Sequence, residues 1–220
     1  KAICLKPQFS EAYTNLADYF FRIQKYETSF DISCKSIKIN LWSPLTYLNQ
    51  GNALTKLGSV KDTLNSYKIT QLLDPKFSLA SYNLGNVYFD KLFQIKAAIS
   101  EYKKTSLVQP NYSQAVAWLM YSKAMTCEWA VKEREFLNDL ESLDKIGLNR
   151  DIVSPFTVLS MEDRPERHKI RSTNFANSLV NSGSSQIFFK NKFKKKRITI
   201  AYFSLYLPSD PVFNLVQKVL

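Results

Sequence analysis

The sequence predicts a mainly α-helical protein: a solenoid of paired helices, then a helical transition region, and finally the first strand and helix of an α/β lobe. Three observations lead to this prediction. Similar segments recur at a constant interval in the first half of the chain. A second stretch keeps the helical spacing of apolar residues but loses the repeat. The chain then closes on a continuous apolar segment, Ile198 to Leu207, followed by Pro208.

The repeat is clearest in three segments, AYTNLADYF, TYLNQGNAL and ASYNLGNVY, whose asparagines are 34 residues apart: Asn15, Asn49 and Asn83. A 34-residue period with this pattern resembles the tetratricopeptide repeat, in which each unit is a pair of antiparallel helices. The second unit fits best, with Gly51 where the two helices approach closely, Gly58 at their turn and Pro75 at the end of the unit. The first unit has Ala17 in place of the glycine, and a fourth unit begins at Ser113 and then departs from the pattern.

Stacked helical pairs bury their apolar faces against each other and leave a concave groove lined by the first helix of each pair. Such a groove commonly holds an extended peptide. An asparagine amide offers both a donor and an acceptor, so Asn15, Asn49 and Asn83 could bind the backbone of a protein or peptide acceptor without reading its side chains. The alternative is that asparagine only suits the repeat pattern at these positions.

Composition narrows the function classes. The three cysteines form no CxxC pair and indicate a reducing compartment, so we expect a cytoplasmic protein. With a single histidine, no metal site is expected. No segment has the pattern of a signal peptide or a membrane span.

The net charge of +11 raises the question of nucleic acid. However, six positive charges are concentrated in the run KNKFKKKR, between Lys190 and Arg197. Such a run just before an apolar segment is more simply a solvated linker than a nucleic-acid site. We therefore expect neither a nucleic-acid partner nor a membrane partner.

The closing segment, Ile198 to Leu207, is too short to cross a membrane, which takes about 20 apolar residues. A continuous apolar run of this length is typical of a strand buried on both faces of a parallel sheet. One strand cannot form a sheet, so its partner strands are expected beyond Leu220. Together with the start at Lys1 instead of a methionine, this suggests that the sequence is a fragment.

Three later motifs, CEW, VSPFTVLSMEDRPE and RITIAYFSLYLPSDPV, follow the repeats in order. Repeats followed by these motifs resemble the protein O-linked N-acetylglucosamine transferases, especially their bacterial homologues. The resemblance implies repeats at 1–125, a helical transition region and linker at 126–189, and the start of the N-terminal lobe of a B-type glycosyltransferase at 190–220. It also implies UDP-N-acetylglucosamine as the sugar donor of the parent protein, bound mainly by a lobe that this fragment lacks; no cofactor is expected in the fragment itself.

In a Rossmann-like lobe, ligands sit beyond the carboxyl ends of the strands, which places the loop Ser204 to Pro211 at the cleft between the lobes. The O-linked N-acetylglucosamine transferases have a histidine in this loop, and in this sequence Asp210 takes its place. A carboxylate with a reference pKa of about 3.9 is a weaker base at neutral pH than an imidazole. Because it occupies the place of that histidine, Asp210 is the candidate catalytic residue, although a weaker base. His168, by contrast, has no catalytic motif around it and is expected to serve helix packing or to lie at the surface.

Two functions follow from these readings. The first is the N-terminal part of a glycosyltransferase, whose repeats recruit proteins for transfer of N-acetylglucosamine to Ser or Thr hydroxyls; the fragment itself is expected to be inactive. The second is a non-catalytic scaffold in which the repeats bind other proteins. The absence of the loop histidine favours the second.

Overall fold

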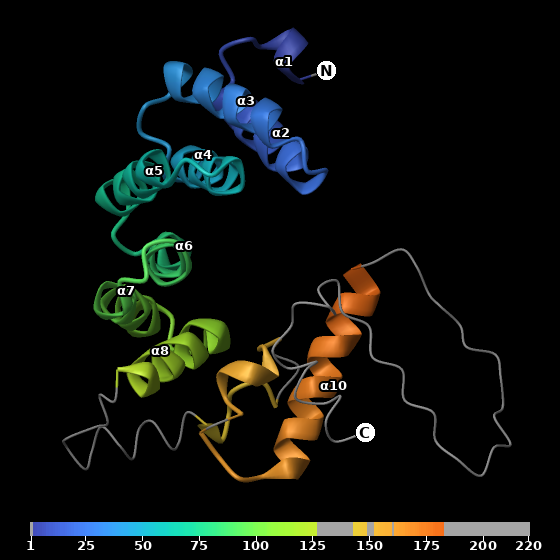
Figure 1. Cartoon of the computed structure of the whole chain (residues 1–220). Helices are drawn as coiled ribbons and strands as arrows, with labels where there is room; N and C mark the ends of the chain where they lie inside the picture. Colours follow the sequence, from blue (N-terminus) through green and yellow to red (C-terminus); the bar gives the residue numbers. More distant parts are fainter. Residues whose placement is uncertain (1, 127–142, 149–151, 160, 183–220) are drawn as a thin grey trace, which may run out of the picture. The chain divides into compact units, whose positions relative to one another are not determined.

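The computed structural model describes residues 2–126, 143–148, 152–159 and 161–182 (Figure 1). The described elements are helices, in chain order: α1 Ala2–Leu5, α2 Ser10–Arg22, α3 Tyr26–Ile39, α4 Pro44–Leu57, α5 Val60–Leu73, α6 Ser78–Asp90, α7 Ile95–Val108, α8 Ser113–Met125, the 3-10 helix η1 Pro155–Thr157, and α10 Pro165–Ser182. Within these ranges there is no strand, and no helix is long and apolar enough to cross a membrane. The predicted strand at 198–207, the basic run and Asp210 lie outside the described residues, so the α/β lobe stays a prediction.

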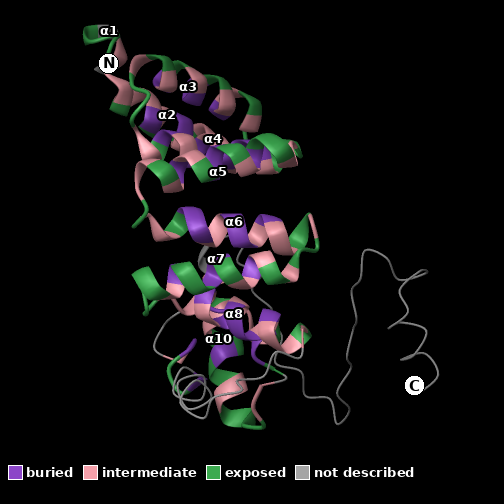
Figure 2. Ribbon diagram, turned by 90° about the vertical axis from the view of Figure 1, so that its left-hand side faces the viewer, coloured by how far each residue is buried: buried purple, intermediate pink, exposed green. Residues whose placement is uncertain are grey.

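The predicted helical pairs are confirmed. α2 packs on α3, α4 on α5 and α6 on α7, and each pair also packs on the next helix in the chain. Buried residues, purple in Figure 2, recur along the helices from α2 to α8. The predicted turn at Gly58 is present: this residue ends α4 in the left-handed conformation, with φ of 84°, which glycine adopts without a steric penalty.

In each pair, a hydroxyl near the end of the second helix lies against the first residue of the first helix. Ser36 donates to the Ser10 carbonyl at 3.0 Å. The hydroxyls of Thr70 and Thr105 lie 3.4 Å from the carbonyls of Pro44 and Ser78, and each shares its proton with a carbonyl of its own helix at 3.0 Å. These carbonyls belong to the first residue of α2, α4 and α6, so the same contact ties the end of each second helix to the start of its first helix.

Close approach within the second and third pairs depends on a glycine beneath a tyrosine. A Cβ atom at Gly51 would lie 2.5 Å from Cε1 of Tyr67, and one at Gly85 would lie 2.6 Å from Cε1 of Tyr102. Real Cβ atoms do not approach a ring carbon this closely, so these positions require glycine. The first pair has the opposite combination, because Ala17 is accompanied by the small Ser33 at the repeat position of the tyrosine.

The residues that follow α8 in the described part close the end of the repeats. Leu143, Ile146, Val153 and Val158 form a buried cluster with Ala117 and Met120 of α8. The apolar face of α8 therefore packs on residues that lie outside the repeat pattern.

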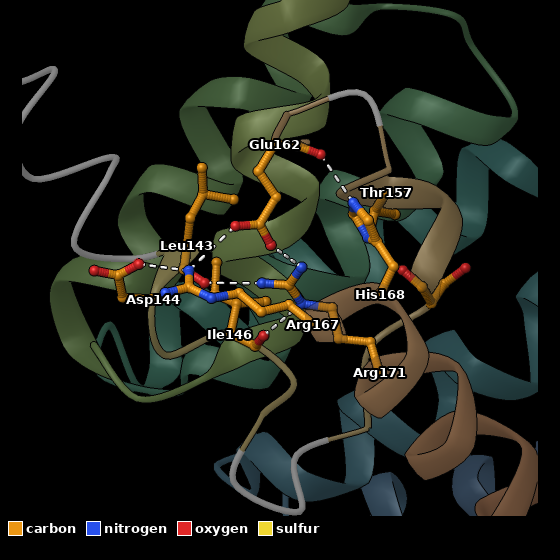
Figure 3. A network of polar contacts seen from close by, with 9 residues as sticks. Leu143, Asp144, Ile146, Thr157, Glu162, Arg167, His168 and Arg171 are labelled. Atoms are coloured by element: carbon orange, nitrogen blue, oxygen red, sulfur yellow. Dashed lines mark hydrogen bonds and ion pairs between the residues drawn. The ribbon is translucent and has the colours of Figure 1, made fainter. Parts of the chain in front are cut away.

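A buried arginine joins α10 to these segments (Figure 3). Arg171 is 1% exposed, and its guanidinium donates to the carbonyls of Ile146 at 2.9 Å and Leu143 at 2.8 Å. Its remaining terminal nitrogen is paired with Glu162. Burial of a charge in this way is tolerated because each of the three guanidinium nitrogens has a partner.

We predict that Gly51→Ala destabilises the protein by about 1–3 kcal/mol, because the new methyl group overpacks against Tyr67. Added to Tyr67→Ser, the same change should cost much less, since the pair then matches Ala17 and Ser33 of the first unit. The measurement is a double-mutant cycle from urea unfolding.

Gly58→Ala is the matched control: it acts through φ alone, so its cost of about 1–2 kcal/mol should be unaffected by Tyr67→Ser. Additive effects of Gly51→Ala and Tyr67→Ser would contradict this account.

Arg171→Met should cost about 3–5 kcal/mol of stability, because it removes the buried partner of Glu162 and of two carbonyl groups. Arg167→Met is the comparison on the same helix. Arg167 pairs with Glu162 as well as with the exposed Asp144, but Glu162 keeps Arg171 in this variant, so the loss of stability should be clearly smaller. Equal losses in urea unfolding would show that the burial of Arg171 is not what matters.

Candidate functional site

The main candidate site is a hollow of about 180 Å³ that opens to solvent along the first helices of successive pairs. Its lining comes from α2, α4 and α6, with one tyrosine from α5: Phe21, Asn52, Thr55, Lys56, Tyr67, Asn83, Asn86, Val87, Asp90 and Lys91. The hollow therefore lies where the repeat pattern predicts a groove.

The three asparagines expected to bind an acceptor do not share one environment. Asn15 is exposed. Asn49 is 5% exposed, and its Nδ2 donates to the Thr14 carbonyl of α2 at 3.1 Å, so it joins two helices instead of facing a ligand. Asn83 lines the hollow, and its Nδ2 donates to Oδ1 of Asn52 at 2.9 Å. The role of these residues in acceptor binding stays a prediction, and Asn83 is the one among them that lines the hollow.

Sequence reasoning missed two asparagines in the same helices. Asn52 and Asn86 come three residues after Asn49 and Asn83, and the recurring dipeptide Gly-Asn was the signal that could have found them. Residues three apart lie on one face of a helix, so these side chains also reach the groove.

A tyrosine fixes each of these two amides. The hydroxyl of Tyr67 donates to Oδ1 of Asn52 at 2.8 Å, and the hydroxyl of Tyr102 donates to Oδ1 of Asn86 at the same distance. Each tyrosine belongs to the second helix of its pair and reaches its asparagine from beside the preceding glycine. The close approach at Gly51 therefore serves the hollow as well as the packing.

The charged residues of the hollow are mainly cationic. Lys56 lies in the last turn of α4, and Lys91 is the C-cap residue of α6. Asp90 is the carboxylate of the hollow; partial burial raises its pKa, and the charge of Lys91 opposes that change.

The groove positions change character in the fourth unit. There, Trp118 and Tyr121 stand at the repeat positions of Asn83 and Asn86, 35 residues later. The ring of Trp118 lies 5.1 Å from that of Phe89 and 5.7 Å from that of Tyr121, edge to face in both cases. Asparagines thus give way to an aromatic cluster along the chain.

The described residues contain no group of three or more His, Cys, Asp or Glu side chains that could hold a metal ion. His168 lies on α10, with Nε2 2.9 Å from the Glu162 carbonyl (Figure 3). This position agrees with a helix-packing role.

These features define a tetratricopeptide-type helical repeat fold. The structure is similar to that of MamA, with a TM-score of 0.57 and 20% sequence identity over 66% of this chain and 84% of that chain. It is also similar to YrrB, described as a TPR protein with an unusual peptide-binding site, with a TM-score of 0.57 and 16% identity over 83% of this chain and 94% of that one. The first TPR domain of Spaghetti (RPAP3), solved with the HSP90 peptide SRMEEVD, gives a TM-score of 0.52 and 18% identity over 55% of this chain and 94% of that one.

At these identities the similarity establishes the fold alone. No protein-family model and no curated protein matches the sequence. The resemblance to O-linked N-acetylglucosamine transferases therefore still rests on the motifs that suggested it.

The tyrosine that closes the hollow gives a pH-dependent prediction. Burial raises the pKa of Tyr67 to about 12, so the folded state holds its proton more tightly than the unfolded state does. The stability that this provides is complete below about pH 10 and is lost as the pH rises toward 12. Between about pH 9 and pH 11, the wild type should lose about 1 kcal/mol more stability than Tyr67→Phe in urea unfolding. Parallel pH profiles would show that the phenol is not protected by burial.

Proposed function

We propose that the repeat region is an interaction module that binds an extended segment of another protein in the hollow between α2, α4 and α6. The observation that carries this proposal is the pair of asparagines, Asn52 and Asn86, each held by a buried tyrosine at an open hollow. Fixed amides suit a peptide backbone because they can bond to its polar groups without reordering.

Two structural neighbours support the same use of the fold. The RPAP3 domain is described as bound to a peptide, and YrrB is described as having a peptide-binding site. Both are similar to this chain in fold only, so they show how such a fold can be used, and the proposal itself depends on the hollow.

The test is a selection of peptides from a random library by the purified full chain, followed by affinity measurements on the selected peptides. Asn52→Ala with Asn86→Ala should weaken binding by about 5- to 150-fold, because two hydrogen bonds of about 0.5–1.5 kcal/mol each are lost. Asn49→Ala is the matched control: it should lower stability, since it removes a buried bond, and leave the affinity of the folded protein nearly unchanged. Selected peptides that bind the double variant as tightly as the wild type would refute the proposal.

A second candidate function is that of a protein O-N-acetylglucosamine transferase, with the repeats recruiting acceptors and UDP-N-acetylglucosamine as the donor. It is supported by the order of the CEW, SPF and RITIAYFS motifs, and its candidate catalytic residue is Asp210. The interaction module has the broader support, because the hollow and the structural neighbours favour it and do not bear on sugar transfer.

Incubation of the full chain with labelled UDP-N-acetylglucosamine and a selected peptide tests whether this chain transfers sugar by itself. We expect no transfer. Transfer that falls by at least about 100-fold in Asp210→Ala would instead establish the catalytic function and a role for this carboxylate as a base.

A further inference from the structure

A residue with a left-handed backbone stands in the turn inside each helical pair. These residues are Gln24, Gly58 and Phe93, with φ of 61°, 84° and 52°. In the third pair, the N–H group of Gln94 then closes the turn onto the Tyr88 carbonyl at 2.9 Å. A left-handed residue followed by such a backward bond is a common way to end a helix, and glycine is the residue that suits it best. The turn therefore imposes this conformation whatever residue occupies it.

Phe93 is the unusual member of this series. A bulky residue in the left-handed region is an outlier, because its Cβ atom crowds the backbone. Burial does not offset this strain, since Phe93 is 79% exposed. A Cβ atom at the equivalent Gly58 would meet nothing within 4 Å, so the position directs its side chain into open space. Strain of this kind is concentrated at sites that contact ligands.

The turn that carries Phe93 lies at the rim of the hollow. The hollow is lined by the last turns of the first helices, with Thr55 and Lys56 from α4 and Asp90 from α6. Lys91, the C-cap residue of α6, also lines it, and Phe93 follows two residues later. This turn covers residues 91–94, whereas the turn of the second pair covers only 58–59. The longer turn thus presents an exposed aromatic ring next to the hollow.

We propose that Phe93 is a specificity-determining residue, whose ring contacts an apolar side chain of the segment that occupies the hollow. This inference rests on the proposed function and names the chemistry of one residue of the ligand. Asp90 and Lys91 carry opposite charges beside the ring, so they give this end of the hollow no preference for a charged residue. An apolar side chain gains instead from the removal of the exposed ring from water.

The first test is a pair of parallel selections from the random peptide library, one with the full chain and one with its Phe93→Asn variant. Asparagine is tolerated in the left-handed region, so the variant keeps the turn and loses the ring. Peptides selected by the wild type should share an apolar residue at one position. Peptides selected by the variant should lose this preference and keep the other shared positions.

The second test measures the contact itself with one peptide selected by the wild type. Phe93→Asn should lower its affinity about tenfold, and so should replacement of the shared apolar residue of the peptide by serine. The two changes together should also cost about tenfold, because both remove the same contact. A combined loss close to the product of the two single losses would contradict a direct contact.

Two controls exclude other roles for the ring. Leu72 is 80% exposed and lies in the last turn of α5, at the other end of the helical pair, so Leu72→Asn should leave the affinity and the selected residue unchanged. Phe93→Gly should weaken binding as Phe93→Asn does, while its urea midpoint stays level or rises, because glycine relieves the strain. A ring with a purely structural role would instead lower the midpoint in both Phe93 variants.

The outcomes separate this inference from the proposed function. Selected peptides without a shared apolar position, or with the same preference in both selections, would overturn the inference and leave the peptide-binding function in place. A wild-type chain that associates with itself through Phe93, with unchanged peptide affinity in Phe93→Asn, would also overturn it. If neither selection yields a peptide, the proposed function fails and this inference fails with it.

Discussion

The contact on which the rest of the described structure depends is the packing of a tyrosine ring over a glycine inside a helical pair. At Gly51 and Gly85 any side chain would collide with the ring of Tyr67 or Tyr102. Both rings are almost fully buried, and each lies in an apolar cluster that extends into the neighbouring pair or helix. The contact therefore sets the spacing within a pair and at the same time contributes to the core between pairs.

The same tyrosines connect packing to recognition. A ring that lies over glycine carries its hydroxyl to the next residue of the first helix, which is an asparagine in both pairs. A phenol is protonated at neutral pH and can donate there, and burial raises the pKa of Tyr67 further, to about 12. A buried polar contact of this kind rigidifies its partners when all of its groups are satisfied. The orientation of the amides is thus a consequence of the core and not of the surface.

The sequence predicted the repeats because apolar and small residues recur at one interval, and nearest-neighbour packing makes that interval sufficient to define the fold. It could not rank the asparagines, because a shared repeat position does not give a shared environment. Asn49 is buried against Thr14 of the preceding first helix, whereas Asn83 meets the polar Asn52 and stays at the hollow. The outcome depends on the residue opposite, which belongs to a different unit and has its own sequence.

The end of the repeats was equally hard to predict, for a related reason. The loss of the pattern after Met125 marked where the repeat stops but not what covers α8. In the structure, Leu143, Ile146, Val153 and Val158 pack on that face. These residues have no repeat period, and Arg171, from a helix that follows them in the chain, donates to the carbonyls of Leu143 and Ile146. A long-range contact of a single arginine leaves no periodic signal in the sequence, although a charged residue on the buried side of a helix is the trace that could have indicated it.

In the first unit, sequence divergence keeps the packing of the two helices but changes the side chains at the groove. In this unit alanine, Ala17, stands in place of the glycine and the small Ser33 in place of the tyrosine, so no ring collides with the added methyl group. The absence of the tyrosine also removes the hydroxyl that would hold a groove amide, and Asp18 pairs with Arg22 instead. The fold tolerates both combinations because each satisfies the same spacing, but only the glycine and tyrosine combination orients an amide at the groove. The chemistry of the hollow therefore belongs to the second and third units, and a search for its ligand should be guided by those two units and not by the repeat as a whole.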